Sequence, residues 1–151
     1  MRAFSIAAFV LLAAFLALVL GRGDWNSAPE AAALAAEKGV GINDFMLVVH
    51  GQKGLRTQIK ELLGAGGPKD DMGWNGLRAR AAVITFLTET ILEKAAPPKG
   101  DKAAWKTKVD EYLKIAKALT KAAEDRDAAA MKIEDAKLTK SCEACHKAHK
   151  A

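Results

Sequence analysis

Apolar side chains in the first part of the chain recur at steps of three and four residues, which is the spacing of one helix face. The first such segment extends from about residue 29 to residue 63. Glycines weaken it, and a break near Gly39 or Gly41 would start the first helix at Ile42. The apolar positions of this face are Ile42, Phe45, Met46, Val49, Leu55, Ile59, Leu62 and Leu63.

The same spacing predicts three further helices. The second extends from about residue 74 to residue 94, after a loop that includes Met72. The third begins at Asp101 and the fourth follows Asp127, because aspartate is a favoured residue at a helix start. The connections are short, so consecutive helices should pack antiparallel. The apolar pattern therefore predicts an all-α, up-down-up-down four-helix bundle. Its later apolar positions include Leu77, Val83, Ile84, Phe86, Leu87, Ile91, Val109, Leu113, Leu119, Met131, Ile133 and Leu138.

The N-terminus has a different pattern. Met1 and Arg2 form a short basic start, and an uncharged, apolar run follows from Ala3 to Leu20. This is typical of a secretory signal peptide, but the run also reaches the length of a membrane span. We therefore predict that residues 1–28 are either a cleaved signal peptide or an uncleaved membrane anchor, and that residues 29–151 form the bundle. Both alternatives place the folded part outside the cytoplasm, as a periplasmic protein.

Composition and charge bear on the fold class and on whether the protein binds nucleic acid. Half of the residues are hydrophobic and 6% are aromatic, and the net charge is +5. β-Branched residues are few after residue 60, which argues against an all-β fold. Lysine and glutamate are spread over the predicted helices as on a solvated surface. The chain has no basic block interleaved with aromatic residues, so we expect no nucleic-acid partner.

The two cysteines of the chain, Cys142 and Cys145, are followed directly by His146 near the C-terminus. CxxCH is the attachment signature of c-type haem. Thiols three residues apart project from one face of a helix and can add to the two vinyl groups of a haem, and the adjacent imidazole can bind the iron. Export is consistent with this chemistry. The motif therefore predicts covalently bound haem c, with Cys142 and Cys145 as thioethers and His146 as the proximal iron ligand.

Three other interpretations of the motif are weaker. A thioredoxin-like redox CxxC would stand in a βαβ pattern, and the sequence predicts no strand here. A disulfide between two residues of one helix turn is geometrically awkward. A zinc site would draw on Cys142, Cys145, His146 or His149, and the remaining histidine, His50, lies far away in sequence.

The chain resembles the class II c-type cytochromes, the family of cytochrome c′ and cytochrome c-556. These are four-helix bundles with CxxCH on the last helix, and the local likeness is best from Asp101 to Lys150. The family often has a basic residue four positions after the haem histidine, where this chain has Lys150. It commonly has an aromatic residue one position earlier, where this chain has His149. The resemblance implies an electron carrier rather than an enzyme, with an unidentified redox partner protein and, in some members, a homodimer.

The resemblance leaves the second axial position of the iron open. In members of the c-556 type a first-helix methionine binds iron, whereas c′-type members leave the iron five-coordinate and bind small gases such as nitric oxide. Met46 is the candidate ligand on the first helix, and the alternative is that it only fills the core. Met131 is too far along the haem helix, and Met1 belongs to the targeting segment. His50 shares a helix side with Met46, and could be a ligand, a hydrogen-bond donor or neither.

The remaining aromatic and histidine side chains are expected to have structural roles. Trp74, Trp105 and Tyr112 are predicted to be packing residues. His149 lies near the end of the last helix and is predicted to be exposed to solvent.

Overall fold

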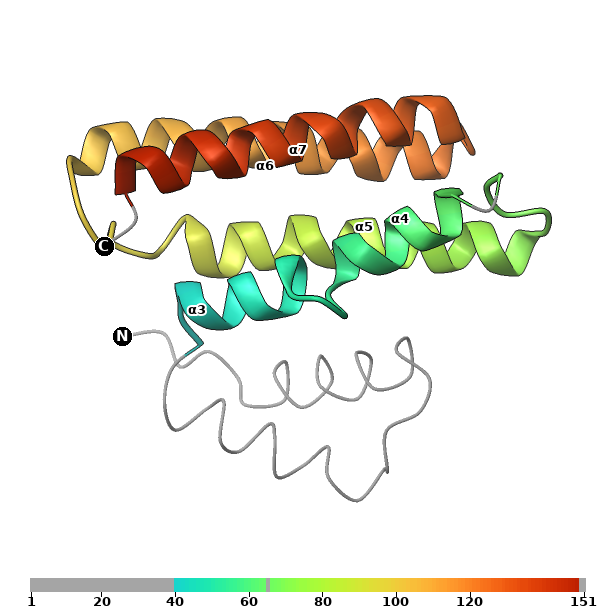
Figure 1. Cartoon of the computed structure of the whole chain (residues 1–151), viewed down its shortest axis with the longest axis horizontal. Coiled ribbons are helices and arrows are strands. Elements are labelled where there is room, and N and C mark those ends of the chain that lie inside the picture. The colour runs from blue at the N-terminus through green and yellow to red at the C-terminus, as the bar shows by residue number, and fades with distance from the viewer. Residues whose placement is uncertain (1–39, 65, 150–151) are drawn as a thin grey trace, which may run out of the picture. The chain divides into compact units, whose positions relative to one another are not determined.

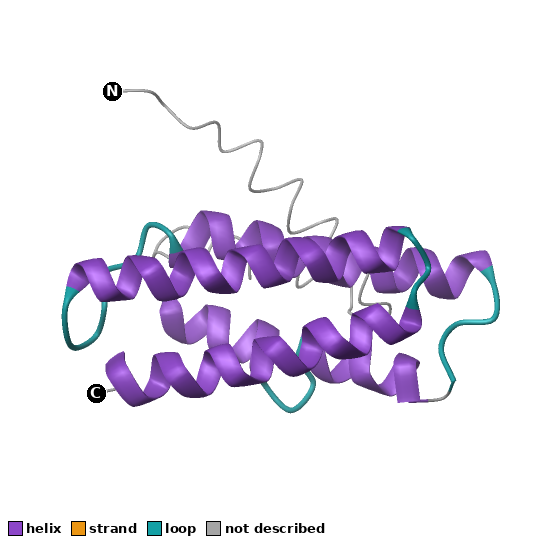
Figure 2. Ribbon diagram, turned by 90° about the horizontal axis from the view of Figure 1, so that it is seen from above, coloured by secondary structure: helices purple, strands orange, loops and turns teal. Residues whose placement is uncertain are grey.

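The computed structural model describes residues 40–64 and 66–149, and every regular element in these ranges is helical (Figures 1 and 2). The elements, in chain order, are α3 (Ile42–Phe45), η1 (Met46–His50), α4 (Leu55–Gly64), α5 (Asp71–Leu87), η2 (Thr88–Leu92), α6 (Lys102–Glu124) and α7 (Ala128–His149). The all-α prediction is confirmed for these residues. None of the described helices is both long and apolar enough to cross a membrane. The predicted signal peptide or anchor, residues 1–28, lies outside the described residues.

Four helical segments pack as a bundle. The first is α3 with η1 and α4, the second is α5 with η2, and the third and fourth are α6 and α7. Successive connections lie at opposite ends in Figure 1, so neighbouring segments run in opposite directions. α6 packs between α5 and α7, and α4 contacts both α5 and α7, which closes the ring.

Aspartate side chains start the later helices. Asp70, Asp101 and Asp127 each accept a hydrogen bond from the backbone N–H three residues ahead, at 2.8, 2.7 and 2.9 Å. These bonds satisfy N–H groups that have no partner within the helix. The predicted starts at Asp101 and Asp127 are confirmed. The prediction for the second helix was wrong by one turn, because Asp70 starts it before Trp74. Met72 therefore lies in the first turn of α5, 82% exposed, and not in a loop.

The first segment is not one continuous helix. After η1 the chain bends at residues 51–54 and becomes helical again at Leu55. The bend is compact, since a Cβ on Gly54 would lie 2.8 Å from the carbonyl oxygen of Val49 and 2.9 Å from that of Val48. η1 is a π-helical turn, a wider form that is common at functional sites. It carries both Met46 and His50.

The close approach at Gly54 predicts that Gly54→Ala lowers the free energy of unfolding by about 1–3 kcal/mol, because the backbone must shift to admit the methyl group. Urea denaturation measures the effect. Gly64→Ala is the matched control, since a Cβ at Gly64 has no atom within 4 Å and alanine favours a helix over glycine by about 0.5–1 kcal/mol. Equal effects of the two changes would contradict this account of the bend.

The core is built from the predicted apolar faces, with two exceptions. Phe86 and Ile133 are 41% and 56% exposed, so they lie outside the packed face. Trp105 and Tyr112 are buried, as predicted for packing residues, and Trp74 is half-buried. The largest fully buried side chains are Phe45, Leu55, Ile59, Leu77, Ile84, Leu119, Met131, Leu138, Val49 and Thr88.

Candidate functional site

The CxxCH motif borders a small cavity near one end of the bundle. The cavity has an open volume of about 20 Å³, room for about one water molecule. α7 contributes the motif, the first segment lies across from it, and η2 and α6 complete the wall. The lining residues are Phe45, Met46, His50, Leu92, Trp105, Lys108, Val109, Tyr112, Ser141, Cys142, Cys145 and His146.

The structure brings the predicted site residues together. Cys142 and Cys145 are half-buried free thiols within α7, and His146 borders the same cavity although its side chain is exposed. Met46 reaches the cavity from η1 and is half-buried. Met131, in contrast, is fully buried elsewhere in the core. Among the methionines of the described residues, Met46 alone lines this cavity.

Both thiols are held in their protonated form. Burial raises the pKa of the Cys142 thiol, although the nearby Arg56 guanidinium acts in the opposite direction. Burial also raises the pKa of Cys145. Redox-active CxxC cysteines have a lowered pKa, so this environment is the reverse of theirs. Within the described residues, no three His, Cys, Asp or Glu side chains are grouped so as to hold a metal ion.

His50 lies between the motif and two polar side chains. Its Nε2 is 3.1 Å from the Tyr112 hydroxyl, and its Nδ1 is 3.3 Å from Nη1 of Arg56. The Cys142 Sγ is 3.7 Å from Nε2. Burial, followed by the charge of Arg56, lowers the pKa of His50 to about 4. The imidazole is therefore neutral at physiological pH.

A buried ion pair, absent from the sequence-based predictions, supports this group. Arg56 Nε donates to Asp135 Oδ1 at 2.7 Å and both side chains are 9% exposed. Nη2 of Arg56 also donates to the Asp135 carbonyl and to the Thr139 hydroxyl. One signal was present in the sequence: Asp135 lies four residues after Met131 and three before Leu138, on the apolar face of the last helix. Such a carboxylate needs a buried partner.

The prediction that His149 is exposed was wrong. The side chain is 3% exposed and its Nδ1 is 2.9 Å from the carbonyl oxygen of Lys99. Since a carbonyl only accepts, Nδ1–H is the donor. The ring also meets Trp105 edge-to-face with centroids 5.4 Å apart. Gly100 permits this approach: its φ is +87°, and a Cβ there would lie 3.1 Å from His149 Nδ1.

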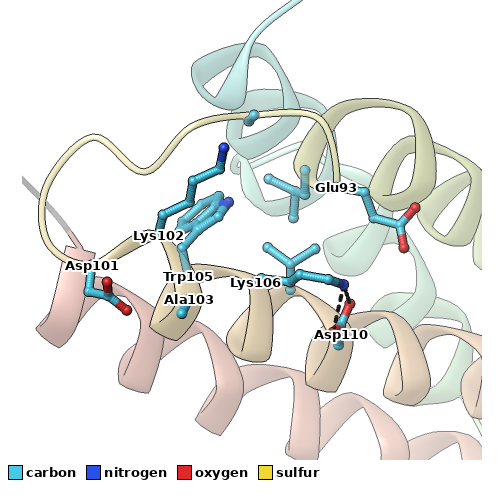
Figure 3. A pocket seen from close by; sticks show the side chains of 10 residues that line it. Glu93, Asp101, Lys102, Ala103, Trp105, Lys106 and Asp110 are labelled. Carbon is cyan, nitrogen blue, oxygen red and sulfur yellow. Dashed lines mark hydrogen bonds and ion pairs between the residues drawn. The ribbon is translucent and has the colours of Figure 1, made fainter.

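A larger cavity lies beside the first. It has an open volume of about 470 Å³, within the usual range of ligand pockets. Leu92, Trp105 and Val109 line both cavities. Figure 3 shows Trp105 among the side chains that surround the larger cavity, with the ion pair between Lys106 and Asp110 nearby.

The residues around the motif fit a haem in their chemistry. They supply two thiols, an imidazole, a thioether and an apolar wall from Leu92 and Val109. Ser141 Oγ is buried at the same place and makes no hydrogen bond within the described structure. The open space of about 20 Å³ is too small for a macrocycle, so the side chains of the wall must move apart when one is bound.

No known protein family, curated protein or solved structure matches this chain. The likeness to class II cytochromes therefore depends on the CxxCH motif, its place on the last helix and the residues around it.

The lowered pKa of His50 predicts that acid destabilises the protein. Between pH 6.5 and 4 the unfolded chain binds a proton at this residue that the folded chain does not bind. The contribution is thus complete above pH 6.5 and is lost as the pH falls toward 4. At about 1.4 kcal/mol per pKa unit, the loss reaches roughly 3 kcal/mol. Urea denaturation at pH 7 and pH 4.5 measures it, and His50→Gln should remove this part of the pH dependence. Equal pH dependence in the two proteins would contradict the assignment.

Proposed function

We propose that the protein is an exported c-type cytochrome that carries electrons through a haem covalently attached to Cys142 and Cys145. The observation that carries the proposal is that both thiols and His146 border a single cavity, to which η1 contributes Met46. Both thiols lie within a helix, and burial raises their pKa values. This environment favours covalent attachment of haem over the function of a redox-active CxxC motif, whose cysteines have a lowered pKa.

Each side chain has a role in this proposal. The Cys142 and Cys145 thiols would hold the haem by adding to its two vinyl groups, and the His146 imidazole would bind its iron. When bound, haem supplies an iron that changes between ferric and ferrous states. Leu92 and Val109 exclude water from the site, which influences the reduction potential.

Met46 is proposed as the distal ligand, because its thioether reaches the cavity from a different helix than His146. A thioether ligand raises the potential of a haem and suits an electron carrier. If Met46 only packs, the iron is five-coordinate and the protein is a gas-binding cytochrome c′.

The absorption spectrum of the protein expressed in a host that attaches haem in its periplasm tests both statements. We expect a Soret band that survives acid–acetone extraction, and a low-spin ferrous spectrum. Met46→Leu, which conserves side-chain volume, should convert the spectrum to high-spin and lower the reduction potential. Met131→Leu is the matched control, because Met131 is buried away from the cavity.

Two results would contradict these expectations. The absence of covalently bound haem would remove the proposed function altogether. A high-spin spectrum that is the same in the parent and in Met46→Leu would assign Met46 to packing and favour gas binding instead.

A further inference from the structure

Both ring nitrogens of His50 already have polar partners. Nδ1 faces the Arg56 guanidinium at 3.3 Å, and Nε2 faces the Tyr112 hydroxyl at 3.1 Å. A guanidinium only donates hydrogen bonds, so Nδ1 must carry the lone pair. In a neutral imidazole the proton is then on Nε2, which donates to the oxygen of Tyr112. The partners thus select one tautomer of His50.

In this arrangement neither ring nitrogen of His50 offers a free lone pair to a metal ion. A metal-binding histidine donates its other ring N–H to a carboxylate, a carbonyl or water, and binds the metal through its free lone pair. In His50 the lone pair on Nδ1 is directed at Arg56 and Nε2 carries the proton, and the Cys142 sulfur is about equally far from the two nitrogens, at 3.8 and 3.7 Å. Binding through Nε2 would move the proton to Nδ1, where it would meet the N–H groups of Arg56.

Arg56 is itself held in place. Its Nε and Nη2 bond to the Asp135 side chain and carbonyl at 2.7 and 2.9 Å, and Nη2 bonds to the Thr139 hydroxyl at 2.7 Å. These partners belong to α7, whereas Arg56 belongs to α4. The guanidinium is buried and cannot turn away from His50 without breaking an ion pair in the core.

We propose that Arg56 is a specificity-determining residue that keeps His50 from binding iron and leaves it as a hydrogen-bond donor beside the haem. This inference rests on the proposed function. It assigns the distal position to Met46 or to an external ligand, and it gives the buried pair of Arg56 and Asp135 a role in ligand choice.

Electron paramagnetic resonance of the ferric protein tests the proposal in a Met46→Leu background, where no thioether competes. With Arg56 present, we expect no low-spin signal of two imidazole ligands. Adding Arg56→Met together with Asp135→Leu, which removes both charges of the pair, should produce that signal. Adding His50→Ala should then abolish it. Arg80→Met is the matched control, because Arg80 bonds to Gln58 and Gly76 and not to His50.

A second measurement does not depend on the variants. The ¹⁵N NMR spectrum of the protein with its native sequence should show His50 protonated at Nε2 and unprotonated at Nδ1. The opposite tautomer would overturn the proposal. It would also be overturned by a His50-dependent two-imidazole signal with Arg56 in place, or by the absence of that signal after Arg56 is removed. The absence of covalently bound haem would overturn the proposed function together with this inference. Covalently bound haem whose iron is bound by His50 while Arg56 is present would overturn the inference alone.

Discussion

A chain in which Cys142 and Cys145 are both replaced by alanine is expected to retain no covalently bound haem. The two thiols are the only cysteines of the chain, and both border the cavity that His146 also borders. A thioether needs the sulfur, so no other residue can replace it. Haem staining after denaturing electrophoresis measures the result, with complete loss of signal expected in the double variant.

Single substitutions test whether each cysteine forms its own thioether. Cys142→Ala or Cys145→Ala should each keep one thioether and remain stained, with a changed absorption maximum. Ser141→Ala is the matched control at the same cavity and should retain both thioethers. Staining that persists in the double cysteine variant would refute covalent attachment through this motif.

Replacing Arg56 alone is expected to lower the free energy of unfolding by about 3–5 kcal/mol, because Arg56→Met leaves the Asp135 carboxylate buried without its partner. Both side chains of the pair are only 9% exposed. Lys60, whose Nζ lies 3.6 Å from Asp135 Oδ2, is 55% exposed and compensates little. Urea denaturation at pH 7 measures the change.

Two further variants distinguish the effect of leaving a carboxylate buried without its partner from the effect of losing any positive charge. Arg56→Met with Asp135→Leu should recover much of the stability, since neither charge then remains buried. Lys106→Met breaks an exposed pair between Lys106 and Asp110, whose side chains are 73% and 50% exposed, and should leave the free energy of unfolding nearly unchanged. A similar loss for Arg56→Met and Lys106→Met would mean that burial does not determine the strength of the pair.

Patterns of a few neighbouring residues correctly predicted the features that depend on interactions within one helix. The starts of α6 and α7 at Asp101 and Asp127 follow from side-chain oxygens that accept from N–H groups three residues ahead. The spacing of Cys142 and Cys145 places both on one side of α7. The predicted start of the second helix at Trp74 was wrong, because the side chain of Asp70 caps α5 one turn earlier.

The first segment shows where local patterns were ambiguous. The predicted helix start at Ile42, directly after Gly41, is confirmed, and Gly39 lies outside the described residues. The second interruption, at residues 51–54, was not predicted. Glycine lowers helix stability wherever it occurs in a helix, so the glycines alone do not show which of them interrupt the segment.

The sequence by itself determined the helical class, three of the helix starts and the motif with its candidate ligand Met46. The tertiary structure alone decided the environments of His50, Arg56 and His149. Arg56 and Asp135 are 79 residues apart, and His149 bonds to a carbonyl 50 residues before it. Helix periodicity and capping act over a few residues, whereas a buried charge or imidazole is stabilised by whichever groups the packing of distant helices brings to it.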